Sequence, residues 1–301
     1  MNRPASSFTV DVDLTNPGQF FACCGLLELA HRLWSDTEVW FDTASGNFAI
    51  AANGASAGME RIFCALGHCD ISGLTEEERR QRDALEKKYR PLRKQKKSLP
   101  PEEEAQRKKL GENAREGVLR IGDPFKLLLN WWRSGDEETP KTWAGKQEIH
   151  KVARAAQEAL CEITNFQKAF DYACVLRLPQ EYRKNSSPRK KVEPFYFDAR
   201  RFTHALDTGW SLDVQSTETV AHPAVELLCL VGLQRFRPSF ADKHFSYRTW
   251  SYPLAAPLAA AIVGGAIPIS GCQYYRFRMR FRDDQKRYKA FDFATRRGDQ
   301  E

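Results

Sequence analysis

The segment Asn16-Pro17-Gly18, followed by QFFACCGLLELAHRLW over residues 19–34, decides how the N-terminal part of this chain folds. Asn-Pro-Gly is a strong breaker of regular structure. In the residues after it, apolar side chains fall on nearly every side of a helix. A helix that is apolar all round is normally buried all round. The sequence therefore predicts an enclosed helix over residues 19–34.

Short strands are expected on both sides of this helix. FTVDVDL at residues 8–14 alternates apolar and polar residues, as a strand does. After the helix, apolar runs at residues 39–41 and 48–52 enclose the loop TASGN, which is typical of a β-hairpin. With a short helix over residues 57–66, the N-terminal segment is predicted to follow the order β-α-β-β-α.

The composition changes sharply after residue 74. Residues 75–116 contain 14 Lys+Arg and 10 Asp+Glu, and apolar side chains nearly vanish. Pro91 and the Pro100-Pro101 pair are expected to divide this segment into two polar helices, over residues 76–89 and 102–116. Two interpretations stay open. The segment is a solvated or disordered insertion, or it is an electrostatic arm for nucleic acid.

Ordinary apolar patterns return at residue 118. The expected elements are a helix that starts at Asp123-Pro124 and contains FKLLLNWW, a helix up to about residue 160, a strand at 195–198, and helices at 223–235 and 254–263. We therefore predict an α+β fold with mixed helices, antiparallel hairpins, a polar helical insertion and a C-terminal β-hairpin. Its regions are an N-terminal α/β segment (1–73), the charged insertion (74–117) and a main α+β region ending in a basic hairpin (118–301).

Composition bounds the class of protein. Hydrophobic residues make up 42% and charged residues 28% of the 301 residues, as in globular proteins. No run of about 18 uncharged apolar residues is present, and the first residues lack the apolar block of a signal peptide. We therefore expect a cytoplasmic protein without membrane contact. Its eight cysteines, none spaced C-x-x-C, are expected to be reduced and mostly packed in the core.

Signatures of catalysis are absent from the sequence. There is no G-x-x-x-x-G-K-[ST] loop, no H-E-x-x-H and no G-x-S-x-G, and the six histidines show no common spacing. We predict no catalytic residue, no metal site and no cofactor. One enzymatic alternative stays open, in which His31 acts as a general base in RNA cleavage.

The strongest local pattern is YYRFRMRFR at residues 274–282. In a strand, the apolar residues of this run lie on one face and its four arginines, Arg276, Arg278, Arg280 and Arg282, lie on the other. Alternate residues are roughly 6.5–7 Å apart, close to the phosphate step of an extended nucleic-acid strand. Arginine also pairs bidentately with phosphate. The pattern favours contact with a nucleic-acid backbone over a solvated sheet face paired with acids.

Other basic residues extend this candidate nucleic-acid-binding set. Net charge is +7, from 46 Lys+Arg against 39 Asp+Glu, and such an excess favours a polyanionic partner when it is concentrated on a few surfaces. The further candidates are Lys286 and Arg287 at the C-terminal turn, Lys94, Lys96 and Lys97 in the insertion, and Arg189, Lys190 and Lys191 in a second polar loop.

A set of longer motifs suggests a family. DLTNPGQFFACCGLLELAHRLW, IGDPFKLLLNWW, KTWAGKQ, EPFYFDARR and ELLCLVGLQRFRP lie along most of the chain. Together they resemble the small-subunit family of type I-G CRISPR loci (formerly I-U, Geobacter-like). The resemblance implies a crRNA-guided surveillance complex (Cascade), in which this chain takes the large-subunit position. Its implied partners are crRNA, target DNA, other Cascade subunits and a helicase-nuclease recruited in trans.

Charge pattern and resemblance lead to the same expected function. The chain is predicted to be a non-catalytic nucleic-acid-binding subunit that contributes to recognition of the PAM and target DNA and to complex assembly. In such complexes base pairing reads the sequence, while protein holds the backbones and inspects a short duplex motif. The alternatives are an endoribonuclease that processes precursor crRNA, and a structural scaffold whose charges face partner proteins.

Overall fold

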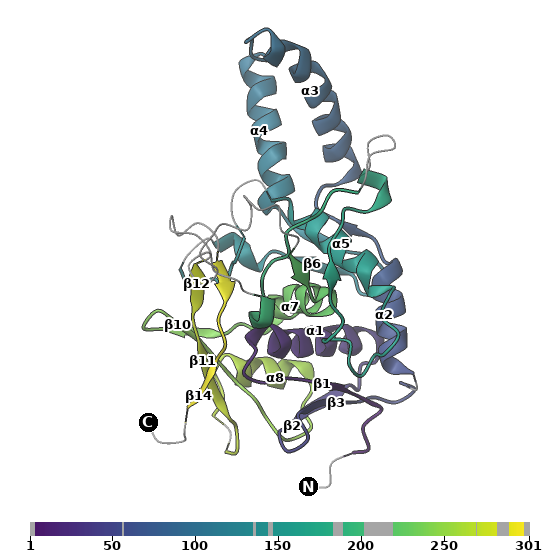
Figure 1. Ribbon diagram of the computed structural model, residues 1–301, viewed down its shortest axis with the longest axis vertical. Coiled ribbons are helices and arrows are strands. Elements are labelled where there is room, and N and C mark those ends of the chain that lie inside the picture. Colours follow the sequence, from purple (N-terminus) through teal and green to yellow (C-terminus); the bar gives the residue numbers. More distant parts are fainter. Residues whose placement is uncertain are drawn as a thin grey trace.

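The computed structural model describes residues 4–55, 57–134, 137–143, 147–182, 189–201, 219–268, 270–281 and 289–297. It confirms the α+β fold, in which helices combine with several small antiparallel sheets. Figure 1 shows two helices at the centre of the body, α1 (Pro17–Leu33) and α7 (Pro223–Arg235). No helix in the described part of the chain is long and apolar enough to cross a membrane.

Helix α1 forms where the sequence predicts it and is buried from its first residue to Ala30. The Asn16 side chain caps it, because its Oδ1 accepts a hydrogen bond from the Gly18 amide at 3.1 Å. Helix α7 is buried from Pro223 to Leu233. Both helices are apolar all round because the protein surrounds them on all sides.

Two glycines bring the backbones of α1 and α7 into contact. A Cβ atom at Gly25 would lie 2.0 Å from the carbonyl oxygen of Leu228, and one at Gly232 would lie 2.1 Å from that of Phe21. Only a hydrogen atom fits at either position. Close to this contact, Arg235 of α7 donates from Nη2 to Oε1 of Glu28 on α1 at 3.2 Å, so a buried carboxylate is paired across the two helices.

The N-terminal sheet packs beside α1. Its strands are β1 (Phe8–Asp11), β2 (Glu38–Asp42) and β3 (Asn47–Ala51), in the antiparallel order β1-β3-β2, which confirms the predicted hairpin. The outer edge of β2 is covered, because the amides of Val39 and Leu254 each donate to the other's carbonyl at 3.0 Å. The predicted helix near residue 60 is α2 (Gly58–His68).

The C-terminal hairpin also forms, but not as one straight ribbon. Its outgoing arm is β11 (Tyr274–Phe277) followed by β12 (Met279–Phe281), and its return is β13 (Lys289–Phe291) and β14 (Thr295–Arg297). Arg276 pairs with Thr295 but Met279 pairs with Phe291, so the return arm holds one extra residue among residues 292–294 and bulges there, opposite Arg278. The predicted continuous strand is therefore wrong at this position.

Two hairpin strands join a larger sheet. It runs β14-β11-β10-β9, where β9 is Ser239–Ala241 and β10 is His244–Arg248. Tyr275 and Phe277 are buried as the alternating pattern requires, and the Tyr275 ring stacks on Tyr247 with 5.4 Å between centroids.

The remaining elements connect these layers. They are β4 (Ile71–Ser72), β5 (Leu119–Ile121), β6 (Leu127–Leu129), the 3-10 turns η1 (Trp131–Ser134), η2 (Gln180–Tyr182) and η3 (Ala199–Arg201), α5 (Ile149–Leu160), β7 (Cys174–Val175), β8 (Val220–Ala221) and α8 (Ala256–Val263). Helices α5 and α8 confirm the predicted segments.

Of the cysteines, Cys23, Cys24 and Cys229 are in the core, but Cys64 and Cys161 are exposed, contrary to the expected packing.

Two predicted elements are wrong. FKLLLNWW is not a helix, since Leu127 and Leu129 belong to β6, which pairs with β5, and a 3-10 turn follows at Trp131. Leu127 and Leu129 are buried while Leu128 is 60% exposed, so the strand alternation is hidden by three identical residues. Residues 195–198 are buried but form no strand.

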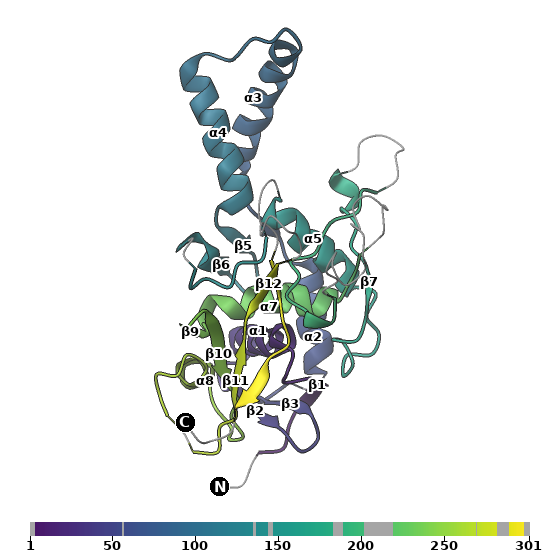
Figure 2. The ribbon, with the colours of Figure 1, turned by 60° about the vertical axis from the view of Figure 1, so that its left-hand side comes forward.

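The charged insertion is a folded helical hairpin, named here the arm. Its helices are α3 (Glu76–Lys94) and α4 (Pro101–Glu116), and they project from the body in both views (Figures 1 and 2). Pro91 does not end α3, which continues for three residues beyond it to Lys94. A narrow apolar contact holds the arm together through its buried residues, Leu85, Leu99, Leu110 and Ala114.

We expect Gly25→Ala to destabilise the protein by about 1–3 kcal/mol or more, because the added methyl group forces the α1 and α7 backbones apart. Urea unfolding followed by circular dichroism measures the change. Gly111→Ala on α4 is the control, since its Cβ would meet nothing closer than 3.5 Å and alanine favours a helix by about 0.5–1 kcal/mol. Equal effects of the two substitutions would show that the helix contact is not constrained.

Candidate nucleic-acid interface

The tip of the arm, residues 87–101, carries an excess of positive charge. It contains seven Lys+Arg and no Asp or Glu, which leaves 39 basic and 39 acidic residues in the rest of the chain. The entire net charge of +7 therefore corresponds to this short segment. Lys94, Lys96 and Lys97 lie here, and all three are exposed.

Most cations of the tip make no ion pair with any described residue. Lys88 is the exception, since its Nζ lies 2.8 Å from Oε1 of Glu103. The cations without such a pair are Lys87, Arg90, Arg93, Lys94, Lys96 and Lys97. Unpaired, solvated cations gathered on one projection are arranged as a polyanion-binding surface requires.

Several acids of the arm pair with groups other than these six cations. Arg107 of α4 binds Glu104 at 2.8 Å and Glu86 of α3 at 3.1 Å. Glu78 closes a capping box with Thr75 at the start of α3. At the root, Arg82 binds Glu148 beside α5 at 2.6 Å and so ties the arm to the body.

The C-terminal arginines lie on one outward face but have acidic neighbours. Arg276 is 3.6 Å from a carboxylate oxygen of Asp242, and Arg278 and Arg280 are each 3.8 Å from Asp292. These are loose, partly exposed pairs of the kind that contribute little to stability. Arg282, Lys286 and Arg287 lie outside the described residues. Acid pairing, which the sequence left open, therefore occupies part of this face.

The third predicted basic group is partly held by the body. Arg189 forms an ion pair with Glu158 of α5. The Lys190 carbonyl accepts a hydrogen bond from the Leu178 amide at 2.9 Å, and Lys191 forms a β-bridge with Arg177. The three groups sit on different elements, and Figures 1 and 2 place the arm tip at the opposite end of the molecule from the β11 and β14 end of the sheet.

Residues considered for catalysis do not gather in the described structure. His31 is half-buried near the end of α1, and its Nδ1 makes no hydrogen bond within the described part of the chain. Among described residues, no group of three or more His, Cys, Asp or Glu is placed to hold a metal ion.

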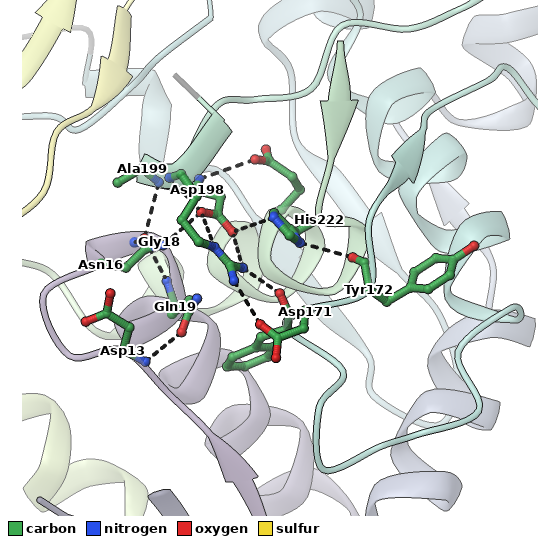
Figure 3. Close-up of polar contacts among 12 residues, drawn as sticks. Asp13, Asn16, Gly18, Gln19, Asp171, Tyr172, Asp198, Ala199 and His222 are labelled. Atoms are coloured by element: carbon green, nitrogen blue, oxygen red, sulfur yellow. Dashed lines mark hydrogen bonds and ion pairs between the residues drawn. The ribbon is translucent and has the colours of Figure 1, made fainter. Parts of the chain in front are cut away.

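A buried polar network, not predicted from the sequence, joins the N-termini of both central helices. Figure 3 shows Asp198 between Asn16, the cap of α1, and His222, which precedes α7. Asn16 donates from Nδ2 to Oδ1 of Asp198 at 2.8 Å, and His222 Nε2 lies 3.9 Å from Oδ2. Arg200 donates from Nε and Nη2 to the same carboxylate at 3.1 and 2.8 Å. The network thereby fixes both helix starts around one anion.

Electrostatics separate the two acids of this network. Burial raises the pKa of Asp198, but the hydrogen bonds and charge of Arg200, with His222 and Asn16, outweigh it and hold the pKa below the usual range. Two helix N-termini also favour an anion there. Burial raises the pKa of Glu226 to about 8, and the charge of Asp198 adds to the shift. Glu226 is therefore neutral at pH 7 while Asp198 is charged.

This network is structural in its geometry. Asp198 and Glu226 are fully buried, and the Asp198 amide donates to Oε1 of Glu226 at 3.3 Å. It stabilises the helix starts beneath the surface, and only its outer part, Arg200 with Asp171, reaches solvent. One signal of it is visible in the sequence, the charged residues within the otherwise apolar EPFYFDARR, but their partners are not.

Comparison of the chain with models of known protein families, with curated proteins and with solved structures finds no match. Its function must therefore be inferred from its own residues, geometry and charge.

We expect Glu226→Gln to remove a pH dependence of stability. The folded-state pKa of about 8 lies above the ordinary 4.5, so this group's stabilising contribution is full below pH 4.5 and is lost as pH rises through 8. Between pH 5 and 8, the free energy of unfolding of the wild type should fall by about a few kcal/mol relative to that of the variant. Urea midpoints across this pH range measure it, with the exposed Glu60→Gln as control. Parallel curves for wild type and Glu226→Gln would contradict the shifted pKa.

Proposed function

We propose that this chain is a non-catalytic nucleic-acid-binding subunit of a type I CRISPR crRNA-guided surveillance complex. In this role it contributes to recognition of the PAM and target DNA and to assembly of the complex in the cytoplasm. A helicase-nuclease recruited in trans cleaves the target. The observation that carries the nucleic-acid part is the arm tip, where cations without ion pairs to described residues make up most of a segment that accounts for the whole net charge.

The physical basis is backbone attraction. Lysine and arginine that neutralise phosphates release condensed counterions, and this favours binding to any nucleic-acid sequence. Gln95 is the only amide side chain of the tip, so it is the one group there that could pair bidentately with adenine. Contacts from the tip therefore position a strand or duplex and leave sequence reading to base pairing with the guide.

The type I assignment rests on the motif resemblance. Its motifs map onto the structural centre: TNPGQFFACCGLLELAHRL forms the cap and body of α1, and ELLCLVGLQR lies in α7. EPFYFDARR supplies Asp198 and Arg200 to the buried network. A family defined by these motifs would share the core, and its nucleic-acid contacts would be built on the surface around it.

We expect the triple substitution Lys94→Gln, Lys96→Gln and Lys97→Gln to weaken binding to unrelated duplexes about equally. Each lost phosphate contact reduces the slope of log K against log salt by about 0.9, so three contacts reduce it by about 2–3. Fluorescence anisotropy over a salt series measures the slope. The matched control removes three cations from the root half of α4 instead, with Lys108→Gln, Lys109→Gln and Arg115→Gln, and should change the slope less.

An unchanged slope in the tip variant would contradict the arm as the binding surface. If Arg278→Ala with Arg280→Ala then lowers the slope, the C-terminal strand is the surface instead. That variant should fold, because the buried face of Tyr275 and Phe277 is untouched. A loss confined to one DNA motif would identify these arginines as base readers.

We expect the chain to co-purify with the other proteins encoded in its operon when crRNA is present, and to leave precursor crRNA intact. Tagged wild-type protein expressed with and without the guide tests the assembly. Cleavage of repeat RNA that His31→Ala abolishes would contradict the proposal and favour the endoribonuclease. The scaffold alternative would be favoured if co-purification did not depend on crRNA and if the chain showed no salt-dependent binding to nucleic acid.

A further inference from the structure

A polar groove, named here the root groove, lies at the root of the arm, where α3 faces the body. Its volume is about 520 Å³, and it is lined among others by Arg79, Asp83 and Arg90 of α3, His150 and Lys151 of α5, and Tyr182 of η2. This volume is in the range of small-ligand sites, about 300–1,000 Å³, and is far too small for a duplex.

Several charges in the root groove already satisfy one another. Arg82 binds Glu148 at 2.6 Å, Lys151 binds the same carboxylate at 2.9 Å, and Arg154 binds Glu181 at 3.0 Å. These pairs form a rigid wall rather than open binding groups.

Other charged and polar groups of the root groove have atoms without a hydrogen-bond or ion-pair partner among the described residues. Arg79, Asp83 and Arg90 make no ion pair with any described residue. Nδ1 of His150 is buried without a hydrogen-bond partner in the described structure. Burial lowers the pKa of His150 to about 4, so the ring is neutral. The groove thus offers cations and a carboxylate to a ligand that itself carries both acceptors and donors, while the His150 ring forms part of its wall.

Tyr182 supplies an aromatic surface beside these groups. Its ring centroid is 6.2 Å from that of His150, and Nζ of Lys151 lies 5.8 Å from it. The ring is half-buried. A tyrosine ring with neighbouring cations is the usual platform on which an unpaired base stacks.

The arginines of α3 extend this arrangement along the arm. At 3.6 residues per turn, Arg79, Arg90 and Arg93 lie within about 60° of one another around the helix. Arg79 and Arg90 are separated by about 16 Å along the axis, at 1.5 Å per residue. An extended strand with a phosphate roughly every 6–7 Å places two or three nucleotides in that interval.

We infer that the root groove binds two or three nucleotides of an unpaired nucleic-acid strand, with phosphates on Arg79 and Arg90 and a base stacked on Tyr182. Between these two arginines, Asp83 faces the base edges and can accept from their amino groups. The inference rests on the proposed nucleic-acid function and adds to it the form of the ligand. Tip contacts bind any backbone, whereas the root groove accepts only bases that are free of a duplex.

The test uses the full chain and a single-stranded 12-mer that carries one 2-aminopurine, together with its duplex. Stacking on Tyr182 should quench the 2-aminopurine fluorescence. Tyr182→Ala should weaken single-strand binding by about 5- to 150-fold, the usual effect of losing one aromatic base contact, and leave duplex binding unchanged. Tyr182→Phe should preserve both quenching and affinity, because the ring remains. Tyr252→Ala, at an exposed tyrosine near α8, is the control.

Thermal unfolding first confirms that Tyr182→Ala is folded. Arg79→Gln provides a second variant, which leaves the aromatic contact intact and changes no residue of the tip. Unchanged single-strand affinity and quenching in both variants would overturn the inference. Equal losses for single strand and duplex would overturn it as well. If the tip variant loses duplex binding while these variants do nothing, the proposed function stands without the root groove. If the wild type binds neither probe at low salt, both proposals fail.

Discussion

The backbone contact between α1 and α7 is the constraint on which the rest of this structure depends. Gly25 and Gly232 meet the opposite helix with no room for a side chain. Two helices that approach so closely must be buried together, and their remaining faces must then be covered by other elements. The sheets, α5 and α8 provide this cover. The arm has no such task, which leaves its surface open to charge.

The same contact explains why a buried carboxylate is stable in the interior. It brings the starts of α1 and α7 to one place, and Asp198 lies between Asn16 and His222. Two helix N-termini and the Arg200 guanidinium offset the cost of removing this charge from water. Glu226, which has no cation of its own in the described surroundings, takes up a proton instead. The network therefore belongs to the helix pair.

Much of the fold could be predicted from local sequence, since α1, α7 and the β2–β3 hairpin have unambiguous apolar patterns. The error at Leu127–Leu129 arose because three leucines hide which of them is exposed. The bulge opposite Arg278 and the Asp198 network depend on residues far apart in the chain, 182 positions in the case of Asn16 and Asp198. The tip cations were visible because they are contiguous, whereas the acids near Arg278 and Arg276 become neighbours only through folding.

The arm also makes the charge distribution of the molecule asymmetric. Acidic and basic residues balance in the body, and the whole excess of positive charge lies on the projecting tip. This separation gives the molecule a large permanent dipole moment along the arm. In the field of a polyanion such a molecule experiences a torque before any contact is made, and it turns tip-first while still a Debye length away, about 8 Å at physiological salt. More collisions would then occur in the correct orientation, so under the proposed function the arm would raise the rate of encounter as well as stabilise the bound state.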